Sequence, residues 1–490
     1  MVQQIRPEGP PSESPSESGI AAVDERLPLG RTTILGLQHV LVMYAGVVVV
    51  PIVVGAGLGL TGNEVAALVS IDLVLAGIGT LLQALGLWKF GIRMPLVVGA
   101  ASNGIVPMVL VGQSHGLGTV YGSLLVSGVI WILAAPYFSR LLRLFPAVVT
   151  GTVIMLIGLT LIPVGLRLIA GPDPAAPGYG DLDKIGLGAF TLALMAVFYR
   201  VLRGFLGQLS ILLAIVIGAI VGWVMGLGTL SEVGNGPVFS MIAPFHFGAL
   251  QFHIPSILLF LIIVFVLMVE GAGQGLAVGE LLDKKITPND ITRLLRVDGL
   301  LTAASGVFSG FVYTTFGQNI GLIALTGVRS RFPVAAGGLI LIALGVVQPV
   351  GRVMAAIPAP VVGAAAVATF SALAVAGIQL LSKVDYSRSS NLLIVMLGLS
   401  VGLIPSVAPS FYVQMPEITR MFFKSGVATG TILAILLNLL FHELGRKAQP
   451  VPPGQIPGQI SGQISGEARG PSSEPTPRDP LEGSADHLSR

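Results

Sequence analysis

The chain has no cysteine among its 490 residues, and only 10% of its residues are charged. The lack of cysteine excludes disulfides, thiolate catalysis and cysteine-based metal sites. The low charge excludes an ordinary soluble globular protein, in which about a quarter of the residues are charged. There is also no HExxH zinc motif and no phosphate-binding loop, so no motif supports an enzyme or a resident metal. The net charge of +3 gives no argument for binding nucleic acid.

Hydrophobic residues make up 53% of the chain, and the mean hydropathy is +0.87. Residues 1–29 are rich in proline, serine and glutamate, and residues 446–490 contain the repetitive run PGQIPGQISGQISG. Both ends are therefore predicted to be disordered tails. The apolar region between them, 30–445, has room for about 14 segments of about 20 residues that cross a lipid bilayer. We predict an all-α polytopic membrane protein, with single segments over 206–227 and 333–356 among its spans.

Basic residues are concentrated in alternate connections between the predicted segments. Because Lys and Arg favour the cytoplasmic side, this alternation predicts an even number of spans and both termini in the cytoplasm of a cell (plasma) membrane protein. The basic residues on that side are Lys89, Arg93, Arg140, Arg143, Arg200, Arg203, Lys284, Lys285, Arg293, Arg296, Arg329, Arg331, Lys383, Arg388, Arg446 and Lys447.

Two predicted segments, the third and the tenth, are interrupted. Met94–Gln113 reads MPLVVGAASNGIVPMVLVGQ, and Phe311–Val328 reads FVYTTFGQNIGLIALTGV. Each predicts an extended strand that turns into a half-helix, and the two hold matching places in two sets of seven, as in transporters with inverted repeats. A helix that begins inside the bilayer leaves unpaired N–H groups there, so a polar binding site is expected at these starts. Two closely packed, glycine-kinked helices are the alternative.

Glu270 is the leading ionisable residue inside a predicted span. It ends the apolar run SILLFLIIVFVLMVE, and Gln274 follows one turn later on the same helix face. A carboxyl group and an amide on one face can recognise the edge of a planar ligand. A carboxyl group in the membrane interior can also take up and release a proton. The alternative is a structural Glu at a helix end.

Other polar residues inside the spans are fewer and less decisive. His39 is expected to organise hydrogen bonds rather than carry a proton, and Asp298 either joins the half-helix network or caps its own segment. Asp72 is a further buried acid for which the sequence names no partner. Gln318 and Asn319 begin the second half-helix, where their amides can offer both donors and acceptors to a ligand.

At these residues the chain resembles the nucleobase/ascorbate transporter family, the xanthine and uracil permeases. That family's signature is Gln, Glu or Pro, followed by Asn-x-Gly-x4-Thr and then Arg, Lys or Gly. The resemblance covers about residues 30–445, in order. The matching residues are the run Gln318-Asn319-Ile320-Gly321 with Thr326-Gly327, the Gln38-His39 pair, Asn103, Glu270 and Asp298.

The resemblance implies 14 segments in two inverted repeats of seven, arranged as two domains. The core would comprise about 30–138 and 256–356, and the gate about 139–228 and 357–445. Such proteins are homodimers in which the core moves against the gate, in an elevator-type mechanism, and carries a nucleobase inward with a proton. No cofactor is implied beyond the coupling proton.

The resemblance also implies roles for individual residues. Glu270 and Gln318 would hold the base from two sides, and Asn103, Gly104, Gln274 and Asn319 would complete the substrate site. Glu270, His39 and Asp298 would couple protons or organise the site.

Gln318 at the first signature position points to an oxidised purine, xanthine or uric acid. Two departures leave a uracil:proton symporter as the alternative. Gln274 stands where purine carriers often have Asp and uracil carriers His, and Gly327 lacks a side chain that tunes selectivity in some members.

Two other classes of protein are compatible with parts of the sequence. An anion exchanger of related fold is one, because the positive ends of half-helices also suit anions. Glu270 argues against it, since a carboxylate in the site would repel an anion. The other is a non-transporting receptor or scaffold, which depends only on the two long tails.

Overall fold

A computed structural model describes most of the membrane region. The described residues are 22–138, 146–171, 178–231, 233–234, 238–239, 243–415, 423 and 425–443, and for Ala45 and Gln318 the description is restricted to the backbone. The chain divides into two units, 1–447 and 448–490. The predicted C-terminal tail and residues 1–21 of the predicted N-terminal tail lie outside the described residues, so the following concerns the first unit.

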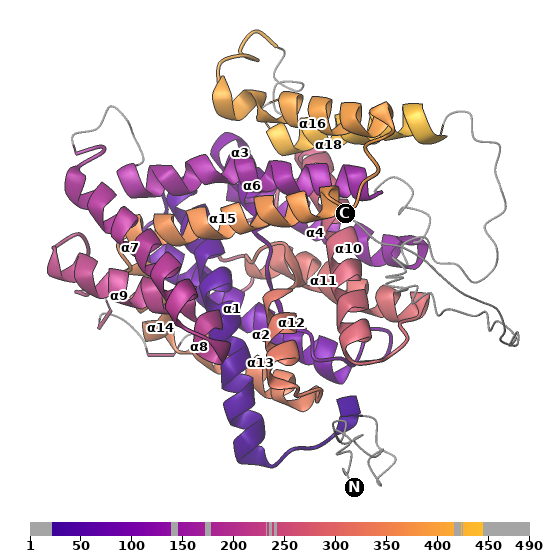
Figure 1. Cartoon of the computed structure of the whole chain (residues 1–490). Helices are drawn as coiled ribbons and strands as arrows, with labels where there is room; N and C mark the ends of the chain where they lie inside the picture. Colours follow the sequence, from indigo (N-terminus) through magenta and orange to yellow (C-terminus); the bar gives the residue numbers. More distant parts are fainter. Residues whose placement is uncertain are drawn as a thin grey trace, which may run out of the picture. The chain divides into compact units, whose positions relative to one another are not determined.

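Helices account for nearly all of the regular structure (Figure 1). The first half contains α1 (Leu29–Leu58), α2 (Gly62–Leu85), β1 (Val98–Ala100), α3 (Ile105–His115), α4 (Leu117–Ala134), α6 (Ala147–Ala170), α7 (Leu182–Val201), α8 (Gly204–Gln208) and α9 (Ser210–Val224). The second half contains α10 (Ile254–Leu281), α11 (Pro288–Phe308), β2 (Tyr313–Thr315), α12 (Gln318–Thr326), α13 (Phe332–Val346), α14 (Gln348–Ala355), α15 (Ala359–Leu381), α16 (Ser389–Val407) and α18 (Gly426–Asn438). Short 3-10 turns cover Ala22–Asp24, Ser102–Gly104 and Ala135–Tyr137, and a π-helical turn covers Leu439–Glu443.

In the described part of the chain, 8 helices are long and apolar enough to cross a membrane. The total of 14 spans stays a prediction. Two predicted segments are each divided into two helices. The segment 206–227 breaks at Leu209, where the Ser210 hydroxyl donates to the Gly207 carbonyl (2.6 Å). The segment 333–356 breaks at Val347, and Pro349 lies in the first turn of the helix α14 that follows.

Helices α2 and α11 begin in the same way. Thr61 accepts from the backbone N–H of Glu64, and the Glu64 carboxylate accepts from the backbone N–H of Thr61. Thr287 and Asp290 repeat this reciprocal capping at the start of α11. Each capping box satisfies otherwise unpaired N–H groups of the first turn. The two helices are the second segments of the two predicted sets of seven.

Helix packing follows the same duplication. Helix α2 packs on α13, where a Cβ added to Gly77 would lie 2.6 Å from the Gly338 carbonyl oxygen. Helix α11 packs on α4, where a Cβ added to Gly128 would lie 2.8 Å from the Gly299 carbonyl oxygen. Both contacts therefore require glycine, because no side chain fits between the backbones. They join the second segment of one predicted set to the fourth segment of the other.

The two interrupted segments meet through their strands. β1 and β2 pair antiparallel, with Val98 opposite Thr315 and Ala100 opposite Tyr313. The pairing continues on either side of the sheet, because Ala101 N donates to the Val312 carbonyl and Phe316 N to the Val97 carbonyl, each at 2.8 Å. The helices α3 and α12 start just beyond the strands. The strand and half-helix pattern predicted for both segments is thus present, and because the strands are antiparallel, α3 and α12 start at opposite ends of the short strand pair.

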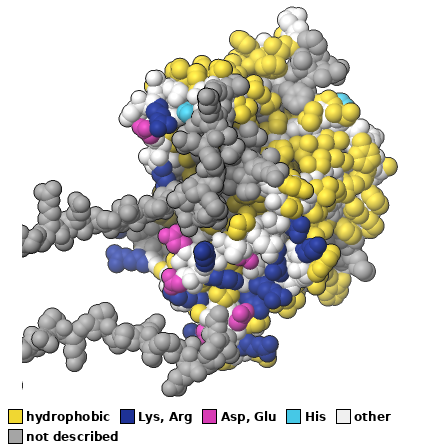
Figure 2. All heavy atoms as spheres, turned by 90° about the vertical axis from the view of Figure 1, so that its right-hand side faces the viewer, with side chains coloured by type: hydrophobic (Ala, Val, Ile, Leu, Met, Phe, Trp, Pro, Cys, Tyr) yellow, Lys and Arg dark blue, Asp and Glu magenta, His cyan; other side chains and the backbone are white. Residues whose placement is uncertain are grey.

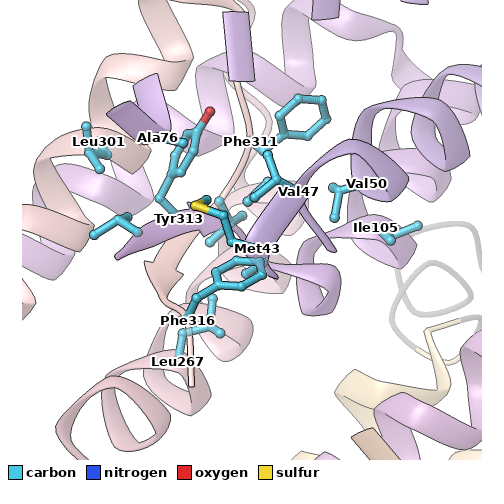
Figure 3. Close-up of a cluster of buried hydrophobic side chains, with 14 of the residues drawn as sticks. Met43, Val47, Val50, Ala76, Ile105, Leu267, Leu301, Phe311, Tyr313 and Phe316 are labelled. Carbon is cyan, nitrogen blue, oxygen red and sulfur yellow. The ribbon is translucent and has the colours of Figure 1, made fainter. Parts of the chain in front are cut away.

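A buried hydrophobic cluster surrounds the strand pair (Figure 3). Its labelled side chains come from α1, α2, α3, α10, α11 and the β2 region. Gly99 in β1 has no side chain to add to this cluster, because a Cβ there would lie 2.6 Å from Phe316 Cε2 and 2.7 Å from Val47 Cγ2. The ring of Phe316 therefore packs directly on the strand backbone.

The remaining helices pack beside this centre. Helices α6 and α15 run side by side across the middle of Figure 1, and α16 and α18 lie next to each other above them. Figure 2 shows hydrophobic side chains over the right-hand side of the view, whereas Lys and Arg gather in its lower part. Exposed apolar residues such as Val197, Tyr199 and Ile220 on α7 and α9 fit a surface that faces lipid.

Several connections predicted to share one side of the membrane do lie together. Arg331 pairs with Asp24 (2.6 Å) and donates to the Ala84 carbonyl at the end of α2 (2.8 Å), and Arg329 pairs with Asp283 (3.0 Å). Residues 22–29, which the sequence assigns to the disordered tail, are therefore partly ordered, because Asp24 pairs with Arg331 just before α13. Which side of the membrane this end faces stays a prediction.

Candidate functional site

Glu270 in α10 forms the centre of a polar group at the half-helix starts. Asn103 Nδ2 donates to Glu270 Oε2 (3.2 Å), and Gln274 Nε2 donates to Glu270 Oε1 (3.4 Å). Asn103 is buried in the turn between β1 and α3, whereas Glu270 and Gln274 keep partial exposure. Both carboxylate oxygens are therefore held by neutral amides.

The start of α12 lies beside the same group. A Cβ added to Gly317 would lie 3.5 Å from Gln274 Nε2, so the backbone that opens α12 borders the Gln274 amide. Gln274 Oε1 is buried and has no hydrogen-bond partner among the described residues. Gln318 is the first residue of α12, and its side chain lies outside the described part of the structure.

Asn319 faces α1 instead of this group. Its Nδ2 donates to the His39 carbonyl (2.9 Å) and lies 3.1 Å from His39 Nδ1. Because an amide nitrogen only donates, His39 Nδ1 accepts, and the imidazole then carries its proton on Nε2. Both side chains are buried. This arrangement favours an organising role for His39 over proton transfer, and it leaves only Asn319 Oδ1 for a further contact.

Asp298 in α11 lies against α10 next to Glu270, at Gly271. Gln83 Nε2 donates to Asp298 Oδ1 (3.4 Å) and to the Leu294 carbonyl (3.0 Å). Asp298 Oδ2 lies 3.2 Å from the position of a Cβ on Gly271, so this glycine allows the close approach. Asp298 therefore belongs to the network between α2, α10 and α11, and it does not cap its segment, which begins at Pro288.

Gly104 helps to hold the turn beside β2. Its N–H already donates to the Ala101 carbonyl (3.0 Å), and a Cβ there would lie 3.0 Å from Val312. Gly104 therefore lacks a side chain because the two interrupted segments pack closely at this turn. Its predicted contact with a ligand stays a prediction.

Sequence reasoning missed three supports of the strand pair. Tyr313 Oη donates to Asp72 Oδ1 (2.8 Å), which supplies the partner that the sequence did not name. Val98 N donates to Thr80 Oγ1 (3.1 Å), and Tyr313 N donates to Thr302 Oγ1 (3.2 Å). Thr80 in α2 and Thr302 in α11 lie on matching segments of the two predicted sets. A search for hydroxyl residues repeated between the halves could have found them.

Comparison with known proteins bears on what this geometry does. The model of the permease family matches residues 30–411. The chain belongs to the nucleobase/ascorbate transporter family. It is 38% identical to the xanthine permease of Bacillus subtilis over 417 residues, which cover 85% of this chain and 95% of that protein. It is 37% identical to the uric acid transporter UacT of Escherichia coli over 436 residues, which cover 88% of this chain and 90% of that protein.

A solved structure shares the fold at a much lower sequence identity. The transmembrane domain of the cyanobacterial bicarbonate transporter BicA matches with a TM-score of 0.51 and 14% identity, over 85% of this chain and 99% of that one. This member of the nucleobase/ascorbate transporter family is therefore a multi-pass membrane transport protein and not an enzyme, and the family resemblance seen in its sequence is confirmed.

Proposed function

We propose that this transporter is a proton-coupled symporter of a purine nucleobase, with xanthine or uric acid as its substrate. The observation that carries the proposal is the Glu270 carboxylate held by Asn103 and Gln274 where two half-helices begin. Relatives at 37–38% identity named as xanthine and uric acid carriers support the substrate class. We further propose that it works as a homodimer, with a core domain that moves against a gate domain.

The chemistry of the site suits an oxidised purine. Such a molecule is planar, and it carries ring N–H donors next to carbonyl acceptors. The Glu270 carboxylate can accept from a ring N–H, and the amides of Asn103 and Gln274 can exchange donors and acceptors with its edge. The N-terminal ends of α3 and α12 carry partial positive charge, which favours the carbonyl oxygens of the ligand.

Proton coupling follows from the partners of Glu270. Its hydrogen-bond donors are amides, and within the described part of the chain Glu270 forms no ion pair with a Lys or Arg side chain. Moving an uncompensated charge through the membrane interior is costly. Uptake of one proton by Glu270 removes that charge, so a site loaded with neutral xanthine would cross without net charge. Asp298 is a second acid that lies against α10, and its charge would influence how readily Glu270 takes up the proton.

Two alternatives remain to be separated by experiment. Uracil shares an imide edge with xanthine and would use the same carboxylate, so competition between labelled xanthine and unlabelled uracil or urate distinguishes them. The fold is shared with a bicarbonate transporter, but a carboxylate in the site disfavours a small inorganic anion, which has no ring N–H donors to pair with it. Chloride or bicarbonate flux without nucleobase binding would favour the anion exchanger.

The decisive experiment is uptake of labelled xanthine and urate into liposomes that contain the purified protein and an inward proton gradient. We expect accumulation that a protonophore abolishes, and at least a hundredfold loss in Glu270→Gln, about 3 kcal/mol of lost interaction. Glu280→Gln is the matched control, since Glu280 lies on the same helix and is exposed. Uptake that survives both the protonophore and Glu270→Gln would disprove proton coupling through Glu270.

A further inference from the structure

Gln208 connects the predicted gate to the half-helix at the site. It ends α8, the short helix between α7 and α9, and α8 lies against α12. A Cβ added to Gly321 in α12 would lie 3.8 Å from Gln208 Nε2. Gly321 is itself exposed. Among the described residues, a gate side chain thus borders α12 within one turn of its start.

The amide of Gln208 is incompletely paired. Its Oε1 is buried and has no hydrogen-bond partner among the described residues, and the same is true of Gln274 Oε1. Buried polar atoms in native proteins nearly always have a partner, which can be a ligand or a water molecule. Both oxygens therefore have the capacity to accept a hydrogen bond from a molecule in the site.

The two amides flank one face of α12. Gly317 and Gly321 are four residues apart and lie on the same side of the helix, about 6 Å along its axis. Gln274 borders Gly317, and Gln208 borders Gly321. Because neither glycine has a side chain, the two amides lie close to the α12 backbone, one at its start and one a turn later. The rise of about 6 Å between the two glycines is comparable with the length of a fused two-ring base.

We propose that Gln208 is a substrate-contacting residue that the gate supplies to the site and that it helps to determine specificity. Its Oε1 accepts a hydrogen bond from a ring N–H of the purine in the conformation in which α8 lies on α12. The inference rests on the proposed function, since it assumes a nucleobase in the site.

The test compares Gln208→Ala and Gln208→Glu with wild type and with Gln379→Ala, an exposed glutamine on α15. Xanthine uptake gives KM and kcat, and competition by 1-, 3-, 7- and 9-methylxanthine shows which ring N–H is recognised. Loss of one neutral hydrogen bond should raise the xanthine KM of Gln208→Ala by roughly 5- to 20-fold. The variant should also lose the discrimination against one methylxanthine. Gln208→Glu keeps an acceptor and should keep that discrimination.

A second measurement stays informative if Gln208→Ala folds poorly. The chain has no cysteine, so Gln208→Cys introduces a single thiol whose labelling can be followed in intact membranes. Saturating xanthine should slow the labelling of Gln208→Cys and leave Gln379→Cys unaffected.

The outcomes separate the two proposals. A wild-type protein that binds no nucleobase refutes the proposed function. If the wild type transports xanthine, the proposed function stands and Gln208 is tested by itself. An unchanged KM and methylxanthine ranking in Gln208→Ala then refutes the role of Gln208. Labelling of Gln208→Cys that xanthine does not slow refutes it as well.

Discussion

The packing of Phe316 on Gly99 gives the sharpest test of the strand pair. An alanine at 99 would place its Cβ 2.6 Å from Phe316 Cε2 and 2.7 Å from Val47 Cγ2, about 1 Å closer than an ordinary carbon contact. Overpacking of this kind costs about 1–3 kcal/mol. Gly99→Ala should therefore lower the apparent melting temperature by a few degrees and reduce transport, because β1 positions the turn that holds Asn103.

The control and the rescue both follow from the same geometry. Gly273→Ala adds a Cβ that meets nothing within 4 Å and should be neutral. Phe316→Leu removes ring atoms from the clash, so Gly99→Ala with Phe316→Leu should be more stable than the sum of the single changes predicts, by at least about 0.5 kcal/mol. Heating of detergent-solubilised protein followed by size-exclusion chromatography measures all four variants. Equal stability of Gly99→Ala and Gly273→Ala would refute the packing.

Three further predictions concern the polar supports. Tyr313→Phe leaves Asp72 buried without its phenol donor and should cost about 1–3 kcal/mol of stability, measured by the same heating assay. Thr80→Val and Thr302→Val each leave a strand N–H unpaired and should cost a similar amount of stability, whereas Thr80→Ser and Thr302→Ser should keep near wild-type stability. Equal losses in the valine and serine variants would contradict the hydrogen bonds from the strand N–H groups to these hydroxyls. Arg331→Gln removes donors from the carbonyls at the end of α2 and should cost about 1–3 kcal/mol of stability. Arg331→Lys should recover less than half of that loss, because Lys lacks the planar fork of donors. An unchanged melting temperature in Arg331→Gln would contradict this role of Arg331.

Much of the architecture was open to prediction from the sequence. The apolar runs identify the spans, because a helix must cover the hydrocarbon core with apolar side chains. The glycine-rich interruptions identify the third and tenth segments as broken, and the position of Glu270 in an otherwise apolar run marks it as the leading polar group. These features are local, so each can be recognised within a stretch of about 20 residues.

Only the tertiary structure decided which polar residues meet. Asn103 and Gln274 contact Glu270, whereas Asn319, which was predicted for the same substrate site, contacts His39. Asp298 contacts Gln83, which the sequence did not single out. The pairing of β1 with β2 joins residues more than 200 positions apart, and no local pattern encodes that register. The pairing of Asp72 with Tyr313 and the position of Gln208 beside α12 depend on the same long-range packing. That packing is set by where glycines let two backbones approach each other closely, which a local pattern does not reveal.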